Sequence, residues 1–159
     1  MSGKPKWLRH LATINHHKKL VMGMVALALA VGGGFAFLGG SGTDVEFTVL
    51  SESEYPGEIV SQVIPQYRKL ERALACVVDD KIYVVATRGE KASDGYEIMI
   101  DKMTLTEEEG TKVLEVYVKF KDPDPEGALG QAVTYPLQVA VTQLEELPEQ
   151  ISLKVQYVD

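Results

Sequence analysis

The pattern of apolar and polar residues changes twice along the chain. Residues 20–38 contain fifteen apolar residues and four glycines, with no charged or polar side chain. As an α-helix this run is about 28 Å long, close to the thickness of a bilayer hydrocarbon core. Residues 59–74 then carry apolar side chains at helical spacing, and from residue 75 onward apolar and polar residues alternate. The pattern predicts a transmembrane helix, a second helix outside the membrane, and then a series of β-strands.

The second helix is expected to be irregular. Ser51 and Glu54 have the spacing of an N-terminal capping box, and the helical period begins again at Ile59 and continues to Leu74. Pro65 interrupts this period because proline has no backbone N–H to donate. We therefore expect either a kink or two short helical pieces.

Seven short strands are expected in the rest of the chain. They are predicted near residues 45–50, 76–78, 82–87, 96–105, 114–120, 133–142 and 151–157, with a turn at Asp79–Asp80. A bulge is expected at residues 101–102, where the apolar positions fall out of phase. Pro136 makes its strand an edge strand or a bulged one. The fold class is mainly β (α+β): an antiparallel sandwich or open barrel with one early helix.

Charge divides the chain at the same place as hydropathy. Residues 1–43 carry five basic and no acidic residues, whereas residues 44–159 carry eleven basic and all 23 acidic ones, a net charge of −12. The positive-inside rule places the amino terminus in the cytoplasm and the acidic domain outside. The expected organisation is a basic arm (1–19), a transmembrane helix (20–38), a linker (39–44) and an extracytoplasmic domain (45–159) at the cell membrane.

Two alternatives concern the apolar run. It is longer than the core of a usual signal peptide, but the small residues at 39–42 would permit cleavage; both readings place the domain outside. Ala28, Gly32 and Ala36 recur at every fourth position, which would allow two such helices to pack as a homodimer.

A net charge of −12 argues against a nucleic-acid partner, because the domain would repel phosphate.

The residue types of the domain exclude several catalytic centres. All three histidines lie before the apolar run, so neither a Ser-His-Asp centre nor an imidazole-ligated zinc site is available in the domain. Cys76 has apolar neighbours and is expected to be a buried thiol. Asp122, Asp124 and Glu126 are interpreted as a solvated turn, with a Ca²⁺ site as the alternative. We therefore expect no enzyme, no metal and no cofactor, although a Ser93/Lys91 dyad is one catalytic alternative.

A polar loop remains as the candidate binding surface. It lies between two predicted strands and begins and ends near a glycine, which is typical of recognition loops on β-scaffolds. The alternative is that the glycines only permit the turn and that Tyr96 packs in the core. The partner-binding candidates are Arg88, Gly89, Glu90, Lys91, Ser93, Asp94, Gly95 and Tyr96, together with Tyr135 and Pro136.

Residues 83–100, YVVATRGEKASDGYEIMI, resemble the PrcB family of protease-complex subunits. Gly89, Glu90, Lys91, Gly95 and Tyr96 match the family's Gly-Glu-Lys-Pro-Thr-Gly-Gly-Tyr core, whereas residues 92–94 depart from it. Residues 131–141, QAVTYPLQVAV, resemble the family's Val-Thr-Tyr-Pro-Tyr strand, with Leu137 in place of the last tyrosine.

This resemblance implies a non-catalytic, β-rich accessory domain that stabilises or recruits a partner protein, in the founding case an extracellular protease. The altered tip of the loop bears on whether that partner is shared. The loop is also loosely similar to the loop by which chagasin-type inhibitors block cysteine proteases, so an inhibitor acting through residues 88–96 is the alternative function. Whether this loop and residues 122–130 lie together at one end of the domain decides how large the binding surface is.

Overall fold

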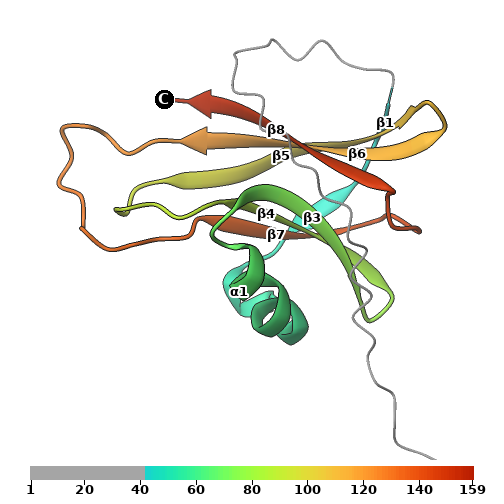
Figure 1. Cartoon of the computed structure of the whole chain (residues 1–159), viewed down its shortest axis with the longest axis horizontal. Helices are drawn as coiled ribbons and strands as arrows, with labels where there is room; N and C mark the ends of the chain where they lie inside the picture. Colours follow the sequence, from blue (N-terminus) through green and yellow to red (C-terminus); the bar gives the residue numbers. More distant parts are fainter. Residues whose placement is uncertain (1–41) are drawn as a thin grey trace, which may run out of the picture.

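A computed structural model describes residues 42–159, which form two four-stranded sheets packed face to face (Figure 1). One sheet has the order β1-β5-β6-β8 and the other has the order β2-β7-β4-β3. The first comprises β1 (Thr43–Asp44), β5 (Glu97–Glu108), β6 (Thr111–Lys121) and β8 (Gln150–Val158). The second comprises β2 (Phe47–Val49), β7 (Leu137–Thr142), β4 (Lys81–Arg88) and β3 (Glu71–Val78). The fold is therefore a sandwich, with no closed barrel among these residues.

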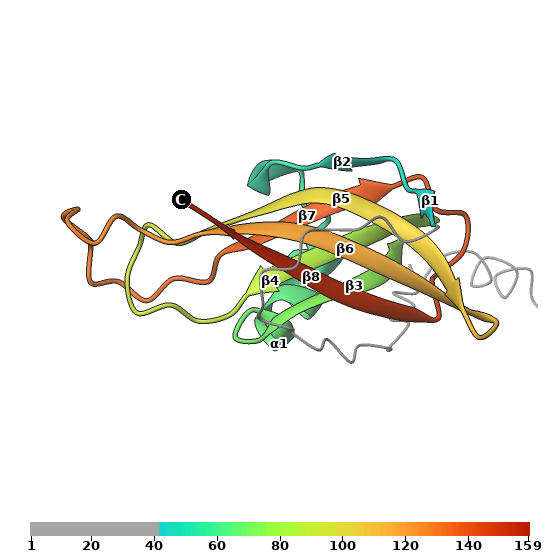
Figure 2. The ribbon, with the colours of Figure 1, turned by 90° about the horizontal axis from the view of Figure 1, so that it is seen from above.

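A helical segment covers the outer face of the β2-β7-β4-β3 sheet, which we call the covered sheet. This segment comprises the π-helical turn η3 (Ile59–Val63) and α1 (Ile64–Tyr67), and it follows the 3₁₀ turn η2 (Glu52–Glu54). Its side chains pack on Leu74, Cys76, Val85 and Val139 of the sheet. No element of residues 42–159 covers the outer face of the β1-β5-β6-β8 sheet, which we call the uncovered sheet (Figures 1 and 2).

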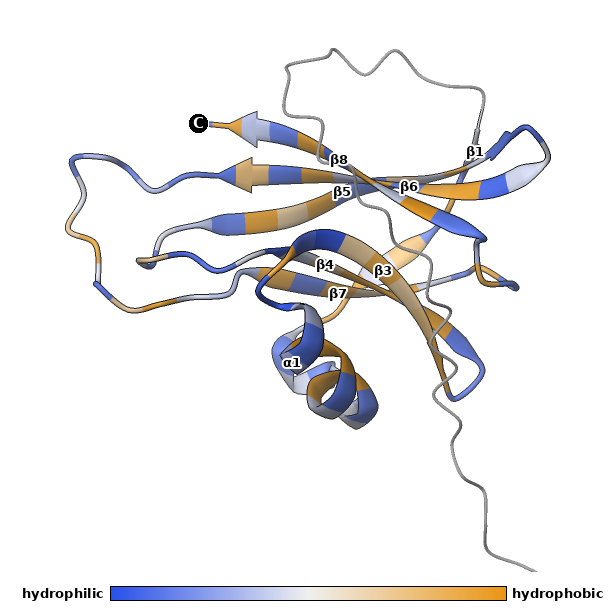
Figure 3. Cartoon of the chain, in the orientation of Figure 1, coloured by the Kyte–Doolittle hydropathy of each residue, from blue (hydrophilic) through white to orange (hydrophobic). Residues whose placement is uncertain are grey.

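The main core lies between the two sheets. β6 contributes every second residue to it, whereas the neighbouring residues on β6 face outward. Figure 3 shows the resulting alternation of apolar and polar residues along the uncovered sheet. The β6 residues in this core are Leu114, Val116, Val118 and Phe120, and they meet Ala73, Ala75, Val84 and Ala86 of the covered sheet.

Several predictions are confirmed. All seven expected strands are present, the turn at Asp79–Asp80 has positive φ at both residues, and the β5–β6 register shifts between Ile100 and Lys102, where a bulge was expected. The helical segment is irregular next to Pro65, as expected: the π-helical turn η3 runs directly into α1, whose second residue is Pro65, and the N–H of Ile64 bonds to the carbonyl of Ile59, five residues earlier. A change of hydrogen-bond register is a known response to a missing donor in a helix.

Other predictions are wrong in detail. The helical period does not continue to Leu74: α1 ends at Tyr67, and Leu74 lies in β3, where it packs against the helical segment. The capping box of Ser51 and Glu54 begins the separate turn η2 rather than the helix. Two residues of the predicted linker form the additional strand β1.

Pro136 and β8 also differ from expectation. Pro136 precedes β7 rather than lying in it, and β7 is an inner strand between β2 and β4. An inner strand needs N–H donors toward both neighbours, and proline has no N–H, so Pro136 lies outside the strand. β8 pairs with β6 in parallel, so the sandwich is not wholly antiparallel. The parallel pairing arises because residues 143–149 cross from the covered sheet to the uncovered one before β8 begins.

The predicted basic arm, transmembrane helix and most of the linker lie outside the described residues, as does the predicted homodimer contact. Within residues 42–159, no helix has the length and apolar character needed to cross a bilayer.

Candidate functional site

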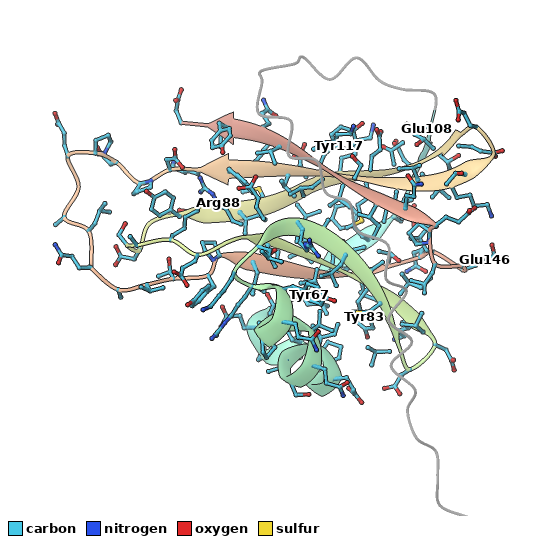
Figure 4. The ribbon with its side chains drawn as sticks, in the orientation of Figure 1. Tyr67, Tyr83, Arg88, Glu108, Tyr117 and Glu146 are labelled. Atoms are coloured by element: carbon cyan, nitrogen blue, oxygen red, sulfur yellow. The ribbon has the colours of Figure 1, made fainter. Side chains whose placement is uncertain are left out.

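The candidate loop begins at an arginine that is buried between the ends of the two sheets. Arg88 is the last residue of β4, and only 2% of its surface is exposed. Its Nη1 donates to the carbonyls of Glu97 (2.9 Å) and Lys121 (2.5 Å), and its Nη2 pairs with the carboxylate of Asp122. Figure 4 shows Arg88 between the ribbons, at the base of the long loops. Such a buried guanidinium fixes the ends of three strands relative to one another.

Aromatic rings surround the same guanidinium. Its carbon lies 4.5 Å from the centroid of Phe120, 5.1 Å from that of Tyr96 and 5.9 Å from that of Tyr157. Phe120 and Tyr157 meet edge to face, with centroids 5.7 Å apart. Cation–π contacts of this kind are stronger where water is excluded. Arg88 therefore organises this end of the sandwich from inside, and a partner would meet the loops that it supports rather than Arg88 itself.

Residues 89–96 and residues 122–136 lie side by side and are bonded together. Lys91 and Thr134 exchange two backbone hydrogen bonds of 2.9 Å, as in a strand pair. The Asp94 carboxylate accepts the N–H of Gly130 at 2.8 Å, and the Thr134 hydroxyl donates to the carbonyl of Ser93 at 2.8 Å. We call these two segments the paired loops; Figure 2 shows them extending beyond the sheets.

Side chains extend this contact to the helical segment. The Tyr135 hydroxyl donates to the carboxylate of Glu90 at 2.8 Å, and this hydrogen bond raises the pKa of Tyr135. The guanidinium of Arg68, just after α1, lies 4.4 Å from the centroid of the Tyr135 ring. The ammonium nitrogen of Lys69 lies 3.9 Å from a carboxylate oxygen of Glu90. Of these residues, Tyr135 and Arg68 are of types that are enriched in protein interfaces, whereas Lys69 and Glu90 are of types that are depleted there.

The glycines of the loop have a steric role. Gly89 and Gly95 have φ of +81° and +84°, a region in which other residues are strained. A Cβ on Gly95 would lie 2.7 Å from the Cβ of Pro123, so glycine is also needed there for the close approach of the second loop. The loop sequence thus explains why the two segments can pack so tightly.

A groove of about 500 Å³ lies beside the paired loops. It is bounded by the start of β5, by residues 135–138 and by the helical region. Its lining is mainly aromatic and aliphatic, with two carboxylates. The residues are Glu52, Tyr55, Val60, Ile64, Tyr96, Glu97, Ile98, Tyr135, Pro136, Leu137 and Gln138.

The thiol of Cys76 and the ammonium of Lys91, two groups considered for catalysis, have the following surroundings. Cys76 is buried, and burial raises the pKa of its thiol to about 11, so it is protonated at neutral pH, as the sequence indicated. The ammonium of Lys91 lies 5.4 Å from the ring centroid of Tyr96. Among residues 42–159, no group of His, Cys, Asp and Glu is arranged to hold a metal.

The acidic residues considered as Ca²⁺ ligands have other partners. Asp122 pairs with Arg88, and the Asp124 carboxylate accepts the backbone N–H of Glu126 at 2.9 Å. The N–H of Gly127 bonds to the carbonyl of Asp124 at 2.9 Å, which closes a turn. These carboxylates therefore stabilise the second loop.

The comparison with protein families matches the segment that carries this site. Residues 82–143 match the family model described as PrcB C-terminal. The PrcB C-terminal match runs from β4 to the end of β7, so it includes both of the paired loops and all ten candidate binding residues. It supports the resemblance that the loop motif and the 131–141 segment indicated. No curated protein and no solved structure matches the chain.

The structure brings most of the candidate residues together. Tyr96, Tyr135 and Pro136 line the groove, while Glu90, Lys91, Ser93 and Asp94 lie on the paired loops above Arg88. Sequence reasoning missed the other eight residues that line the groove: Glu52, Tyr55, Val60, Ile64, Glu97, Ile98, Leu137 and Gln138. No local motif identifies them, because they come from segments that only the fold places side by side.

Proposed function

We propose that this protein is a non-catalytic accessory subunit that binds a partner protein and stabilises or recruits it, and that this partner is a protease. The observation that carries the proposal is the surface formed by the paired loops and the adjoining groove. The loops are preorganised by main-chain bonds between Lys91 and Thr134 and by the Asp94–Gly130 contact, so binding does not require them to become ordered. The match of residues 82–143 to PrcB C-terminal supports a role in a protease complex.

Our proposal of a non-catalytic role rests on the chemistry available at the surface. The ammonium of Lys91 lies over the ring of Tyr96, and the thiol of Cys76 is buried below the helical segment. A nucleophile needs an activating neighbour and an exposed position. Cys76 is not exposed, and Lys91, the activating group in the Ser93/Lys91 alternative, is directed to the ring of Tyr96. We further propose that the domain lies outside the cytoplasm, anchored by residues 20–38; this rests on the apolar run and on the distribution of charge.

The test is capture of a partner by the full-length chain in its own membranes. After chemical crosslinking and solubilisation, one protein should co-purify in stoichiometric amount. The variant Ala92→Arg/Leu129→Arg adds bulk and charge to exposed positions on both loops and should reduce capture about tenfold, a loss of about 1.4 kcal/mol of binding free energy. Glu108→Arg, at the opposite end of β5, is the control and should leave capture unchanged.

Three results would overturn the proposal. The first is that no protein co-purifies, and the second is that the loop variant and the control behave alike. The third is that the purified chain slows proteases at stoichiometric concentration, in which case the protein is an inhibitor acting through residues 88–96. A carboxy-terminal alkaline phosphatase fusion checks the topology separately, since an inactive fusion would place the domain in the cytoplasm.

A further inference from the structure

β5 has an open edge next to the groove. On one side it pairs with β6 from Glu97 to Glu108. On the other side β1 pairs only with Thr104 and Leu105, and one further bond joins the N–H of Val45 to the carbonyl of Met103. Residues 97–102 have no strand beside them within the described chain, and Figure 2 shows β1 only at the far end of β5. An edge of this kind presents backbone groups to which another chain can bind.

Two side chains, Gln138 and Tyr55, hydrogen-bond to backbone groups of the strands around the groove. The N–H of Ile100 donates to the side-chain oxygen of Gln138 at 2.8 Å. On β7, which faces β5 across the groove, Leu50 donates to the carbonyl of Val139 and the Tyr55 hydroxyl hydrogen-bonds with the backbone of the same residue. The two bonds made by side chains, those of Gln138 and Tyr55, are of a kind that an incoming backbone can replace.

One hydrogen bond shows which backbone groups of β5 point toward its open edge. Ile98 and Ile100 belong to the core between the sheets, so their side chains point from one face of β5 into the sandwich, roughly perpendicular to its open edge. In an antiparallel ladder, alternate residues direct both their N–H and C=O groups to the same side. Since the N–H of Ile100 points out to Gln138, the N–H and C=O of Ile98 also point outward.

We propose that this groove receives an extended segment of the partner protein, which adds as a strand to β5 at Ile98 and inserts an apolar side chain among Tyr55, Tyr96 and Tyr135. The inference rests on the proposed function and names how the partner is recognised. The open stretch of six residues matches a segment about 20 Å long at the usual rise of a strand. Backbone bonds supply affinity and the side-chain pocket supplies selectivity in this mode of binding.

The charge of the groove defines the segment further. Glu52 and Glu97 line it, and Glu52 is close enough to contribute to the raised pKa of Tyr55, after the larger effect of burial. Lys or Arg beside the inserted apolar residue would therefore be favoured. A second copy of this chain fits less well, because residues 44–159 carry a net charge of −12 and two copies would repel each other.

The experiment uses the full-length chain in a non-ionic detergent and a fluorescent peptide of alternating Lys and Val residues. We expect saturable binding by fluorescence anisotropy and slower hydrogen exchange at the Ile98 amide. The same peptide with alternate backbone nitrogens methylated should bind about tenfold more weakly, because it can no longer pair along one edge. A Glu/Val peptide should also bind more weakly.

Matched variants test the location. Glu52→Lys and Glu97→Lys should each weaken binding of the Lys/Val peptide, whereas Glu108→Lys, the same charge change at the other end of β5, should not. Val60→Trp, at an exposed position on the groove wall, should block it by bulk alone. Equal binding of the methylated and unmethylated peptides, or peptide-dependent dimers of the chain, would overturn the inference.

The outcome is separable from that of the proposed function. A chain that captures its partner in membranes but neither binds the peptide nor loses the partner in Glu97→Lys would refute strand addition and leave the accessory role standing. A chain that captures no partner refutes the accessory role, whatever the peptide does.

Discussion

β4 of the covered sheet and β6 of the uncovered sheet are both inner strands, yet they have different patterns of burial. From Val84 to Arg88 every residue of β4 is buried, whereas β6 alternates buried and partly exposed residues from Leu114 to Phe120. The difference arises on the outer faces: the helical segment covers one and no described element covers the other. A strand with two covered faces reads as a continuous apolar run, and a strand with one covered face alternates.

The largest expected effect comes from a charge placed between the covered sheet and the helical segment. Val85 is fully buried between the covered sheet and the helical segment. Val85→Asp would place a carboxylate there without a partner, and we expect a loss of about 4 kcal/mol or more in the free energy of unfolding. Urea denaturation followed by circular dichroism measures it. Met99→Asp, on the outer face of β5 with 52% exposure, is the control and should change stability by less than about 0.5 kcal/mol.

A cavity under the helical segment should have the next largest effect. Ile59 is fully buried, and Ile59→Ala should cost about 3 kcal/mol through lost burial and an unfilled cavity. Its neighbour Val60 is 48% exposed, so Val60→Ala should be nearly neutral in the same denaturation experiment. Equal losses of unfolding free energy in Ile59→Ala and Val60→Ala would mean that the helical segment does not pack on the covered sheet in solution.

Arg88, at the end of β4 in the covered sheet, bonds to β5 and β6 of the uncovered sheet, so replacing it tests how the two sheets are held together at the loop end. Arg88→Met keeps the aliphatic volume but leaves the carbonyls of Glu97 and Lys121 without the guanidinium. We expect a loss of about 2 kcal/mol, because Asp122 is 60% exposed and water can reach this end. Amide hydrogen exchange should accelerate mainly in the paired loops. Faster exchange spread evenly over both sheets would contradict a local role for Arg88.

The smallest effect is a dependence on pH beneath the helical segment. Burial raises the pKa of the Cys76 thiol from 9.0 to about 11, so the unfolded chain releases this proton at a lower pH than the folded one. The stabilising contribution is complete below pH 9 and is lost as pH rises from 9 toward 11. Cys76→Ala should therefore lose less stability than the original chain between pH 8 and about pH 10.5. If the free energy of unfolding fell equally with pH in Cys76→Ala and in the original chain, Cys76 would not be the source of the pH dependence.

Most of the strands could be predicted from the sequence, because the alternation of apolar and polar residues along a strand depends on whether one or both of its faces are buried. It failed where tertiary contacts outweighed the local pattern. Leu74 has a helical spacing from Ile59 and Val63, but it meets them from the neighbouring strand rather than from the same helix. The parallel strand β8 could not be foreseen, since its alternation is the same in either direction.

The candidate site was predictable only as far as it is local. The glycines of the loop and the motif around them identify the segment that bears the paired loops. A charged residue such as Arg88 is expected to be exposed in a loop. Its burial is explained only by the fold, which places the carbonyls of Glu97 and Lys121 where its guanidinium can donate to them. The groove depends on residues from the helical region and from β7 that are about 80 positions apart in the sequence.

The short segment that contains β1 and β2 also has a mechanical consequence. Its two strands are only two residues apart, yet β1 is bonded to β5 in one sheet and β2 to β7 in the other. Sliding of one sheet along the other would have to break one of these attachments. The segment therefore acts as a cross-tie against shear, and a pull applied upstream of Thr43 would load the β1–β5 bonds before it reached the rest of the sandwich.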